Sequence, residues 1–315
     1  MLPKTLLFAL LALLPSPVIS VFPSRSPKRG LCHVPSEDHP PDDKIWTASA
    51  NALTWYYNYL ATPSPAYAQN PNLHFIPMLW GQPSNSRTTS TPFLDQITSQ
   101  LSAGQNITYV LGFNEPDGPH STGGSNLSPL SASQIWQREL EPLRKLGIKL
   151  GAPAVTGSPR GFTWLKDFFA ACDGKCNPDF MPIHWYGNFE GLASFIGQMM
   201  AEYPELKIWV TEWGFPWQDL KTTQGFFATA VDWLDRIENI THYAYFGAFR
   251  SDVSNVGPNS AMLTAKGQLT DIGSWYMGGN LTHAVPTAGA PSSQRYATFA
   301  GWALLVLAVG IWGVL

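Results

Sequence analysis

Short, almost uninterrupted apolar runs recur along the chain and alternate with stretches of helical character. Eight such runs occur between residues 30 and 247. Near-continuous apolar runs are typical of parallel strands that are covered on both faces. We therefore predict strands at Gly30–His33, Leu53–Asn58, His74–Trp80, Tyr109–Glu115, Lys149–Pro153, Phe180–Trp185, Ile208–Trp213 and Tyr243–Gly247.

Most of the intervening segments carry helix signals. Thr91 and Pro92 have the residue types of an N-cap and a first helical position, so a helix is expected to begin there. The other predicted helices are Ser131–Lys145, which ends at Gly147, Phe162–Ala171, Leu192–Tyr203 and Thr222–Ile237. The segments after the first two strands show no clear helical pattern.

Strands that alternate with helices imply parallel βαβ units. Eight units in about 260 residues predict an α/β protein built as a single (β/α)8 TIM barrel, over residues 28–278. A doubly wound sheet is the alternative fold, but the chain lacks a glycine-rich dinucleotide fingerprint.

Both ends of the chain carry the pattern of processing signals. Residues 1–20 carry Lys4 near their start, continue in a leucine-rich run and end in small or medium residues. This pattern predicts a secretory signal peptide. A buried N-terminal helix is the alternative. Residues 296–315 are uncharged, and the 17 residues from Phe299 are almost wholly apolar.

Residues 279–295 are small and polar, and they precede this apolar tail. Small residues, a polar spacer and a terminal apolar segment form a GPI-anchor signal. We expect attachment at Ala288, Gly289 or Ala290 and removal of the tail. An uncleaved membrane helix at the C-terminus is the alternative, although 17 residues is at the short limit for a span.

Four Asn-X-Ser/Thr sequons agree with secretion, and they lie at Asn106, Asn126, Asn239 and Asn280. Asn106 and Asn239 precede predicted strands, at the end of the barrel where the strands begin. Asn126 follows the fourth strand, where a glycan would border the opposite end, at which the strands finish. We expect a secreted glycoprotein at the cell surface or cell wall, held on the outer leaflet of the plasma membrane by a GPI anchor.

The three cysteines divide into a close pair and a single residue. Cys172 and Cys176 enclose three residues, and an oxidising compartment favours a disulfide between them. A zinc pair is the competing possibility, but no second Cys/His pair stands at ligand spacing. Cys32 lies in an apolar run and is expected to be a buried free thiol.

Composition narrows the class of protein. The 315 residues are 44% apolar and 13% charged, with a net charge of −3. The apolar content excludes disorder over the whole length, and a nucleic-acid-binding protein would show a basic domain. Aromatic residues, which are counted within the apolar 44%, make up 13% of the chain, enough for a large core and for aromatic side chains elsewhere.

Two carboxylates end predicted strands. Glu115 ends the run that begins at Tyr109, Glu212 ends the run that begins at Ile208, and the two lie 97 residues apart. This separation corresponds to about three βα units, which places the pair on strands four and seven. The C-terminal ends of barrel strands form the catalytic face, and a charge at an apolar strand end is costly unless it is paired or used.

Facing carboxylates are what glycoside hydrolysis requires. Asn114, which precedes Glu115, can donate a hydrogen bond to the sugar hydroxyl beside the reacting carbon. The acid of such a pair needs a raised pKa, which apolar surroundings and the second carboxylate provide. The alternative for each glutamate is a structural ion pair or a helix cap. Asp117, just beyond Glu115, is expected to form a turn rather than take part.

The two segments Gly112–Asp117 and Trp209–Gly214 resemble the signature strands of clan A glycoside hydrolases. Within that clan the chain most resembles family 128, the fungal group similar to alkali-sensitive linkage protein. Supporting segments lie on the first, second, third and sixth strands, and they are Lys28–Leu31, Trp55–Asn58, Pro77–Gly81 and His184–Gly187. The resemblance covers residues 28–278.

This resemblance implies hydrolysis of β-1,3-glucan with retention of configuration, by an endo-acting enzyme. By motif match, Glu115 is the acid/base and Glu212 is the nucleophile. The family also contains exo-acting and oligosaccharide-binding members. A wall protein that binds β-glucan without cleaving it, and a clan A glycosidase acting on another polysaccharide, are therefore the alternatives.

Residues near the predicted strand ends are candidates to contact the sugar. Aromatic side chains combine apolar area with a polar group, as sugar binding requires. The candidates are Asn58, Trp80, Asn114, His184, Trp185, Tyr186, Trp213, Trp217 and Tyr245. Core packing is the alternative for each aromatic residue and for His184. No cofactor, metal ion or nucleic acid is expected to bind. Membrane contact is expected only through the lipid anchor. The protein is expected to be a monomer.

Overall fold

The computed structural model describes residues 26–48, 51–68, 70, 72–83 and 89–288. The predicted signal peptide and apolar tail, and two of the three candidate attachment residues, lie outside these ranges. Ala288, the third, is exposed. Among the described residues, no helix combines the length and apolar character needed to cross a membrane.

Eight parallel strands form the centre of the molecule, as the apolar runs predicted. Each predicted run overlaps one observed strand, in the same order along the chain. The strands are β1 (Arg29–His33), β2 (Trp55–Tyr57), β3 (His74–Phe75), β4 (Tyr109–Val110), β5 (Lys149–Leu150), β6 (Phe180–Tyr186), β7 (Lys207–Gly214) and β8 (Ile240–Ala248).

The strands close into a barrel. Six of them form one sheet in the order β3-β2-β1-β8-β7-β6, and β4 pairs with β5. Parallel bridges between Met78 and Leu111 and between Gly151 and Phe180 connect the two sheets at both edges. The arrangement is the predicted (β/α)8 barrel, in which the C-terminal ends of all strands face the same side.

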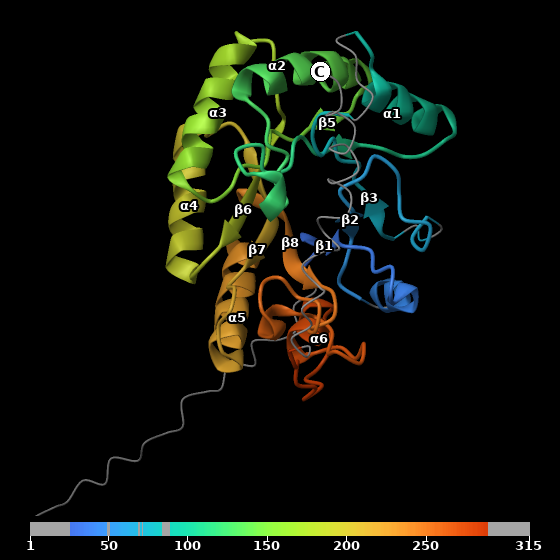
Figure 1. Cartoon of the computed structure of the whole chain (residues 1–315), viewed down its shortest axis with the longest axis vertical. Helices are drawn as coiled ribbons and strands as arrows, with labels where there is room; N and C mark the ends of the chain where they lie inside the picture. The colour runs from blue at the N-terminus through green and yellow to red at the C-terminus, as the bar shows by residue number, and fades with distance from the viewer. Residues whose placement is uncertain (1–25, 49–50, 69, 71, 84–88, 289–315) are drawn as a thin grey trace, which may run out of the picture.

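Helices cover one side of this barrel more completely than the other. Figure 1 shows α2, α3, α4 and α5 as a curved wall beside the strands, with α1 continuing it above β3. The helices are α1 (Pro92–Ser102), α2 (Pro129–Glu139), α3 (Pro159–Cys172), α4 (Phe189–Glu202), α5 (Leu220–Arg236) and α6 (Asp271–Tyr276). Short 3-10 segments occur at η1 (Pro40–Thr47), η2 (His120–Thr122), η3 (Glu141–Leu146) and η4 (Pro258–Ser260). No α-helix follows β1 or β2 in the described chain, in agreement with the weak helical pattern there.

The predicted helix Ser131–Lys145 is divided in two. Its α-helical part, α2, ends at Glu139, and η3 follows and ends before Gly147, which has φ 80°. Pro142 explains the division, because proline lacks an amide hydrogen and disfavours the α conformation in the residue before it. The predicted end at Gly147 is confirmed.

The N-terminus of α1 is capped differently from the prediction. Thr91 occupies the N-cap position, but its hydroxyl donates to Asp95 Oδ1 rather than accepting from the helix. Instead Oε2 of Glu139, on α2, accepts hydrogen bonds from the amides of Phe93 and Leu94, both at 3.0 Å. A carboxylate at this helix end is favoured by the helix dipole, and it ties α1 to α2.

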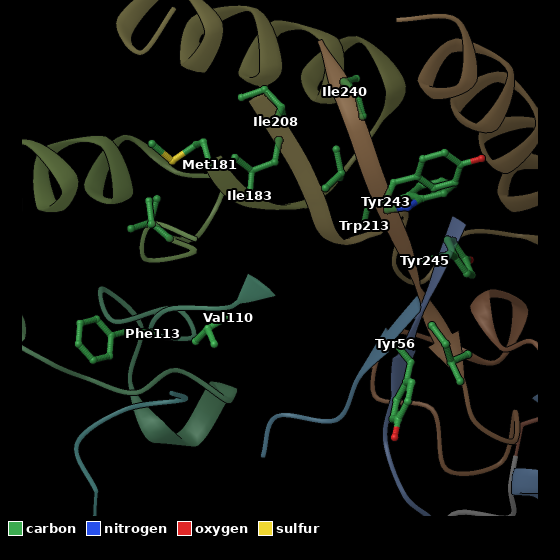
Figure 2. Close-up of a cluster of buried hydrophobic side chains, with 14 of the residues drawn as sticks. Tyr56, Val110, Phe113, Met181, Ile183, Ile208, Trp213, Ile240, Tyr243 and Tyr245 are labelled. Carbon is green, nitrogen blue, oxygen red and sulfur yellow. The ribbon is translucent and has the colours of Figure 1, made fainter. Parts of the chain in front are cut away.

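Two layers of apolar side chains fill the fold. Figure 2 shows Met181, Ile183, Ile208 and Ile240 between the strands and the surrounding helices. A second cluster lies inside the barrel, where Trp209 stacks on Phe180 and on His242 with ring centroids 4.1 and 3.6 Å apart. Burial lowers the pKa of His242 to about 4, so this ring is neutral near pH 7. The barrel interior is a packed core, as in other barrels of this kind.

Gly30 is required where β1 meets β2. An added β-carbon at Gly30 would lie 2.1 Å from Cε2 of the Trp55 indole, which fills the barrel interior. We expect Gly30→Ala to lower the free energy of unfolding by about 1–3 kcal/mol because the core becomes overpacked. Urea denaturation followed by tryptophan fluorescence measures this change.

Gly197→Ala is the matched control. Gly197 is exposed within α4, and nothing lies within 4 Å of an added β-carbon. Because alanine favours a helix by about 1 kcal/mol over glycine, this variant should be as stable as the wild type or more stable. An unchanged urea midpoint for Gly30→Ala would contradict the proposed packing at Trp55.

Candidate active site

The barrel brings the two predicted carboxylates together. Glu115 lies just beyond β4 and Glu212 lies near the end of β7, with 9% and 5% of their surfaces exposed. One oxygen of each carboxylate and a ring nitrogen of His184 all lie within 4.8 Å of one another. Side chains 97 residues apart in sequence therefore form one site at the C-terminal end of the barrel.

Glu115 is held in a strained backbone conformation. Its φ of 39° lies in the left-handed region, which residues with a side chain rarely adopt. Its amide donates to Ala154 O at 2.7 Å, and its carbonyl accepts from Gly118 N at 2.8 Å. Strain of this kind persists only where surrounding contacts enforce it, and it is concentrated at functional sites.

His184, on β6, bridges the two carboxylates. Its Nδ1 lies 3.0 Å from Glu115 Oε1 and 3.6 Å from Glu212 Oε2. Burial disfavours the charged ring, but attraction to Glu212 and Glu115 outweighs that penalty and raises the pKa of His184. The histidine can therefore carry a positive charge that offsets the repulsion between the carboxylates.

Glu212 accepts one phenolic hydrogen bond on each oxygen. Tyr59 donates to Oε1 at 2.8 Å, and Tyr186 donates to Oε2 at 2.5 Å. Burial raises the pKa of Glu212, and repulsion from Glu115 acts in the same direction. His184 and the two tyrosine hydroxyls oppose this rise by stabilising the charged carboxylate.

Asn114 leaves an acceptor free beside Glu115. Its amide nitrogen donates to Gly123 O at 3.0 Å. Its side-chain oxygen is buried and has no hydrogen-bond partner among the described residues. Such an oxygen is unfavourable unless a ligand satisfies it, so Asn114 is suited to accept a hydrogen bond from a substrate hydroxyl.

Asp117 forms a turn, as predicted, and also connects two loops. The hydrogen bond from Gly118 N to Glu115 O closes a turn that contains Asp117. The Asp117 carboxylate accepts from the amide of Thr156 at 2.9 Å and from its hydroxyl. It thereby fixes the loop that carries Glu115 against the loop after β5.

Two aromatic residues predicted to contact sugar do not reach the site. Trp213 and Tyr245 are fully buried, and their rings pack against each other and against Phe227 on α5. Successive strand residues point to opposite faces. Because Glu212 points into the barrel mouth, Trp213 must point outward, and its prediction as a sugar contact is wrong. The same holds for Tyr245.

Trp185 and Asn58 both contact neighbouring parts of the structure. The indole nitrogen of Trp185 donates to Asn188 O, and its ring packs against Phe195 on α4. The Asn58 amide donates to Thr62 O and to Ser64 Oγ, and Asn58 is buried. The prediction for Asn58 is therefore corrected, because its amide and its carbonyl are already bonded within its own loop. Trp185 is half-buried, and its contact with a sugar stays a prediction.

Trp80 and Trp217 lie at or near the surface of the catalytic face. Trp80 is half-buried beyond β3, and its ring stacks on that of His120 at 5.8 Å. Trp217 is 70% exposed in the loop after β7, with φ 60°. Their contact with a sugar stays a prediction. Tyr186 and His184 reach the carboxylates directly.

Tyr59 is a site residue that the sequence did not reveal. It lies two residues beyond the end of β2, and its φ of 62° turns its side chain toward Glu212. The apolar pattern stops at Asn58, and a left-handed residue leaves no mark in such a pattern. Its place just after a barrel strand was the one signal available.

The predicted disulfide and sequons can be placed in the structure. A disulfide joins Cys172 to Cys176, and Cys32 is free and buried as expected. Three of the four sequon asparagines are exposed and Asn239 is half-buried. Asn126 lies in the loop after β4, on the same side as Glu115. Glycosylation itself stays a prediction.

The carboxylates and His184 also have the spacing of a metal site, since their ligand atoms lie within 4.8 Å. Both oxygens of Glu212 already accept hydrogen bonds from tyrosine hydroxyls, so this carboxylate is satisfied without a metal ion. The absence of a metal requirement stays a prediction.

Comparison with known proteins shows which family this chain belongs to. Residues 30–276 match the family model described as the glycosyl hydrolase catalytic core. Alkali-sensitive linkage protein 1 of Schizosaccharomyces pombe is 30% identical over 263 residues, which cover 81% of this chain and 45% of that protein. The chain thus spans less than half the length of this relative.

Solved structures agree with the barrel. An exo-β-1,3-glucanase of glycoside hydrolase family 128, subgroup VI, from Aureobasidium namibiae matches with a TM-score of 0.66 and 22% identity, over 81% of this chain and 97% of that one. A subgroup II endo-β-1,3-glucanase from Pseudomonas viridiflava matches with a TM-score of 0.64 and 26% identity, over 82% and 99%.

The hydrogen bond from Tyr186 should lower the pKa of Glu212. Because a donor to the carboxylate favours its charged form, Tyr186→Phe is expected to raise the pKa of Glu212 by about 0.5–1. The pH titration of the side-chain carboxyl carbon by 13C NMR, assigned by its loss in Glu212→Gln, measures this value. Tyr203→Phe, on the far end of α4, is the control and should leave it unchanged. A lowered pKa in Tyr186→Phe would contradict the assigned hydrogen bond.

Proposed function

This chain belongs to the glycosyl hydrolase catalytic core family, within glycoside hydrolase family 128, and we propose that it hydrolyses β-1,3-glucan with retention of configuration. The observation that carries the proposal is the carboxylate pair at the ends of β4 and β7, with one oxygen of each within 4.8 Å of the other. Retaining enzymes place their carboxyl groups about 5–5.5 Å apart, whereas inverting enzymes leave about 6.5–9.5 Å for a water molecule.

Glu212 is suited to act as the nucleophile. Two tyrosine hydroxyls fix the direction of its oxygens, and His184 supplies nearby positive charge. In the first step one Glu212 oxygen forms a bond to the anomeric carbon as the glycosidic bond breaks. The product of this step is a covalent glycosyl ester and a free leaving sugar.

Glu115 is suited to act as the acid and then as the base. It donates its proton to the leaving oxygen in the first step. In the second step it takes a proton from the water that attacks the glycosyl ester, which regenerates both carboxyl groups. Its contact with Nδ1 of His184 holds Oε1, so Oε2 is the oxygen directed toward substrate.

Asn114 would bind the sugar whose anomeric carbon reacts. Its unpaired buried oxygen can accept a hydrogen bond from the 2-hydroxyl beside the reacting carbon. Hydrogen bonds to this hydroxyl strengthen in the transition state of such enzymes. The hydrogen bonds of this side chain thus favour acceptance, whereas its sequence position alone suggested donation.

The substrate and mode of action rest on the relatives. Both solved relatives described above are named as β-1,3-glucanases, one exo-acting and the other endo-acting. We propose endo action, because the endo-acting relative has the higher sequence identity with this chain. We further propose that the enzyme acts as a monomer, without a cofactor.

Hydrolysis of linear β-1,3-glucan is the direct test. The wild-type protein should release a series of oligosaccharides from curdlan or laminarin, and Glu212→Gln and Glu115→Gln should each lower the rate by at least about 1,000-fold. Chromatography of the released sugars measures the rate, and glucose as the sole early product would indicate exo action. Asp173→Asn, which changes an exposed carboxylate in the Cys172–Cys176 loop, is the matched control and should keep full activity.

Two results would replace this proposal. Binding of the glucan by the wild type without any release of oligosaccharides would make the protein a β-glucan-binding wall protein. Activity on mannan, xylan or β-1,4-glucan alone would change the substrate. The 1H NMR spectrum of the first product decides the stereochemistry: the β-anomer supports Glu212 as nucleophile, and the α-anomer would indicate inversion.

We also propose that the protein is secreted and held at the cell surface by a GPI anchor. The apolar tail after a small, polar segment supports this, together with the leader-like N-terminus. Phosphatidylinositol-specific phospholipase C should release the protein from intact cells, and a chain that ends at residue 295 should enter the medium without treatment. Membrane-bound protein that resists the phospholipase and retains peptides from residues 296–315 would favour the uncleaved helix.

A further inference from the structure

A buried thiol lies behind the proposed nucleophile. Cys32, at the C-terminal end of β1, is fully buried and forms no disulfide. Its Sγ lies 2.9 Å from the hydroxyl of Tyr59 and 3.1 Å from that of Tyr57. Neither the carboxylate pair nor the disulfide accounts for this contact.

Tyr59 joins the thiol to Glu212. Its single hydroxyl lies against Cys32 Sγ on one side and donates to Glu212 Oε1, at 2.8 Å, on the other. The left-handed φ of 62° is a cost for a tyrosine, so neighbouring contacts must hold the residue in place.

The residue after Cys32 secures the same loop. His33 Nδ1 lies 3.1 Å from Ser64 Oγ, and the Asn58 amide donates to that oxygen at 3.0 Å. The amide of Leu60 in turn donates to Asn58 Oδ1. The end of β1 therefore holds the Tyr59 loop at two points. Cys32 contacts the Tyr59 hydroxyl, and His33 contacts Ser64, which binds Asn58.

The donor in the contact between Tyr59 and Cys32 can be assigned by counting the hydrogens that each side chain carries. A tyrosine hydroxyl has one hydrogen, and that of Tyr59 is directed to Glu212. The contact between Tyr59 and Cys32 therefore requires the thiol to be the donor. Burial raises the pKa of Cys32, which keeps the thiol protonated and able to donate.

We propose that Cys32 is a positioning residue for Glu212 and that it acts through the hydroxyl of Tyr59. The inference rests on the proposed role of Glu212 as nucleophile. The thiol hydrogen fixes the phenolic oxygen on the side away from Glu212. It also polarises the hydroxyl, since hydrogen bonds in a chain strengthen one another.

Other titratable groups face the same cluster and must stay constant in any test. They come from β2, β4 and β6, and they are Tyr57, Glu115, His184 and Tyr186. Substitution of Cys32 leaves all of them in place. A change in the titration of Glu212 in such a variant then reports the loss of the thiol donor.

Two substitutions at Cys32 separate donation from packing. Cys32→Ala removes the donor and creates only a small space. Cys32→Ser keeps a donor that is smaller than the thiol. Leu31→Met is the matched control, because Leu31 is the neighbouring buried residue on β1 but lies in the outer core, away from Tyr59.

We expect Cys32→Ala to raise the pKa of Glu212 by about 0.5, as measured by 13C NMR, because a donor that favours the carboxylate is weakened. The acidic limb of the pH profile of kcat/KM should move upward by the same amount. At the optimum, kcat should fall about 3- to 10-fold with KM within about twofold, since binding contacts are unchanged. Cys32→Ser should restore most of both changes, and Leu31→Met should show neither.

A double-mutant cycle tests whether Tyr59 is the intermediary. In a Tyr59→Phe background, Cys32→Ala should cause no further shift, because the hydroxyl through which it acts is gone. Full additivity of the two shifts would overturn the inference, as would an unshifted Glu212 in Cys32→Ala or equal losses in the alanine and serine variants.

The NMR titration is independent of catalysis, so the two proposals can fail separately. A shifted Glu212 in a protein that hydrolyses no glucan would retain the positioning role and remove the proposed function. Normal hydrolysis of glucan, with no shift in the pKa of Glu212 in Cys32→Ala, would retain the proposed function and remove the positioning role.

Discussion

The proximity of two buried carboxylates is the constraint on which the rest of this structure depends. Glu115 and Glu212 would repel each other strongly in a site from which water is largely excluded. The structure opposes this repulsion with His184 between them and with a tyrosine hydroxyl on each oxygen of Glu212. These compensating groups come from the ends of β2 and β6, so the site exists only when the barrel is closed.

The surrounding scaffold explains how such an arrangement is kept rigid. Below the site, Trp209, Phe180 and His242 stack tightly inside the barrel, which leaves the strand ends little freedom to move. Above it, strained residues are tied down by short contacts: Glu115 through Ala154 and Gly118, and Tyr59 through its hydroxyl. The stability of the core therefore compensates for local strain at the catalytic face, as is common at functional sites.

The sequence was sufficient for the barrel and for its two carboxylates because both depend on simple patterns. Eight apolar runs have the signature of covered parallel strands. A glutamate at the end of such a run is expected at the C-terminal face of the barrel. The aromatic predictions were weaker, because alternation sends neighbours such as Glu212 and Trp213 to opposite faces, and a shift of one residue reverses the assignment. Tyr59 and the Glu139 cap on α1 depend on loop conformation and on contacts between helices, which no local pattern records.

The hydrogen-bond donors around Glu212 also constrain how the site can respond to pH. Burial raises the pKa of Tyr59, Tyr186 and Cys32, so each keeps its hydrogen across the neutral range. Groups that do not titrate cannot exchange protons with a substrate, and their effect on Glu212 is constant. Burial raises the pKa of Glu212, and attraction to Glu212 outweighs burial and raises the pKa of His184, so the charges of these two groups depend on each other. Three hydrogen-bond donors that keep their hydrogens therefore hold Glu212 in one orientation, whatever charge its neighbours carry.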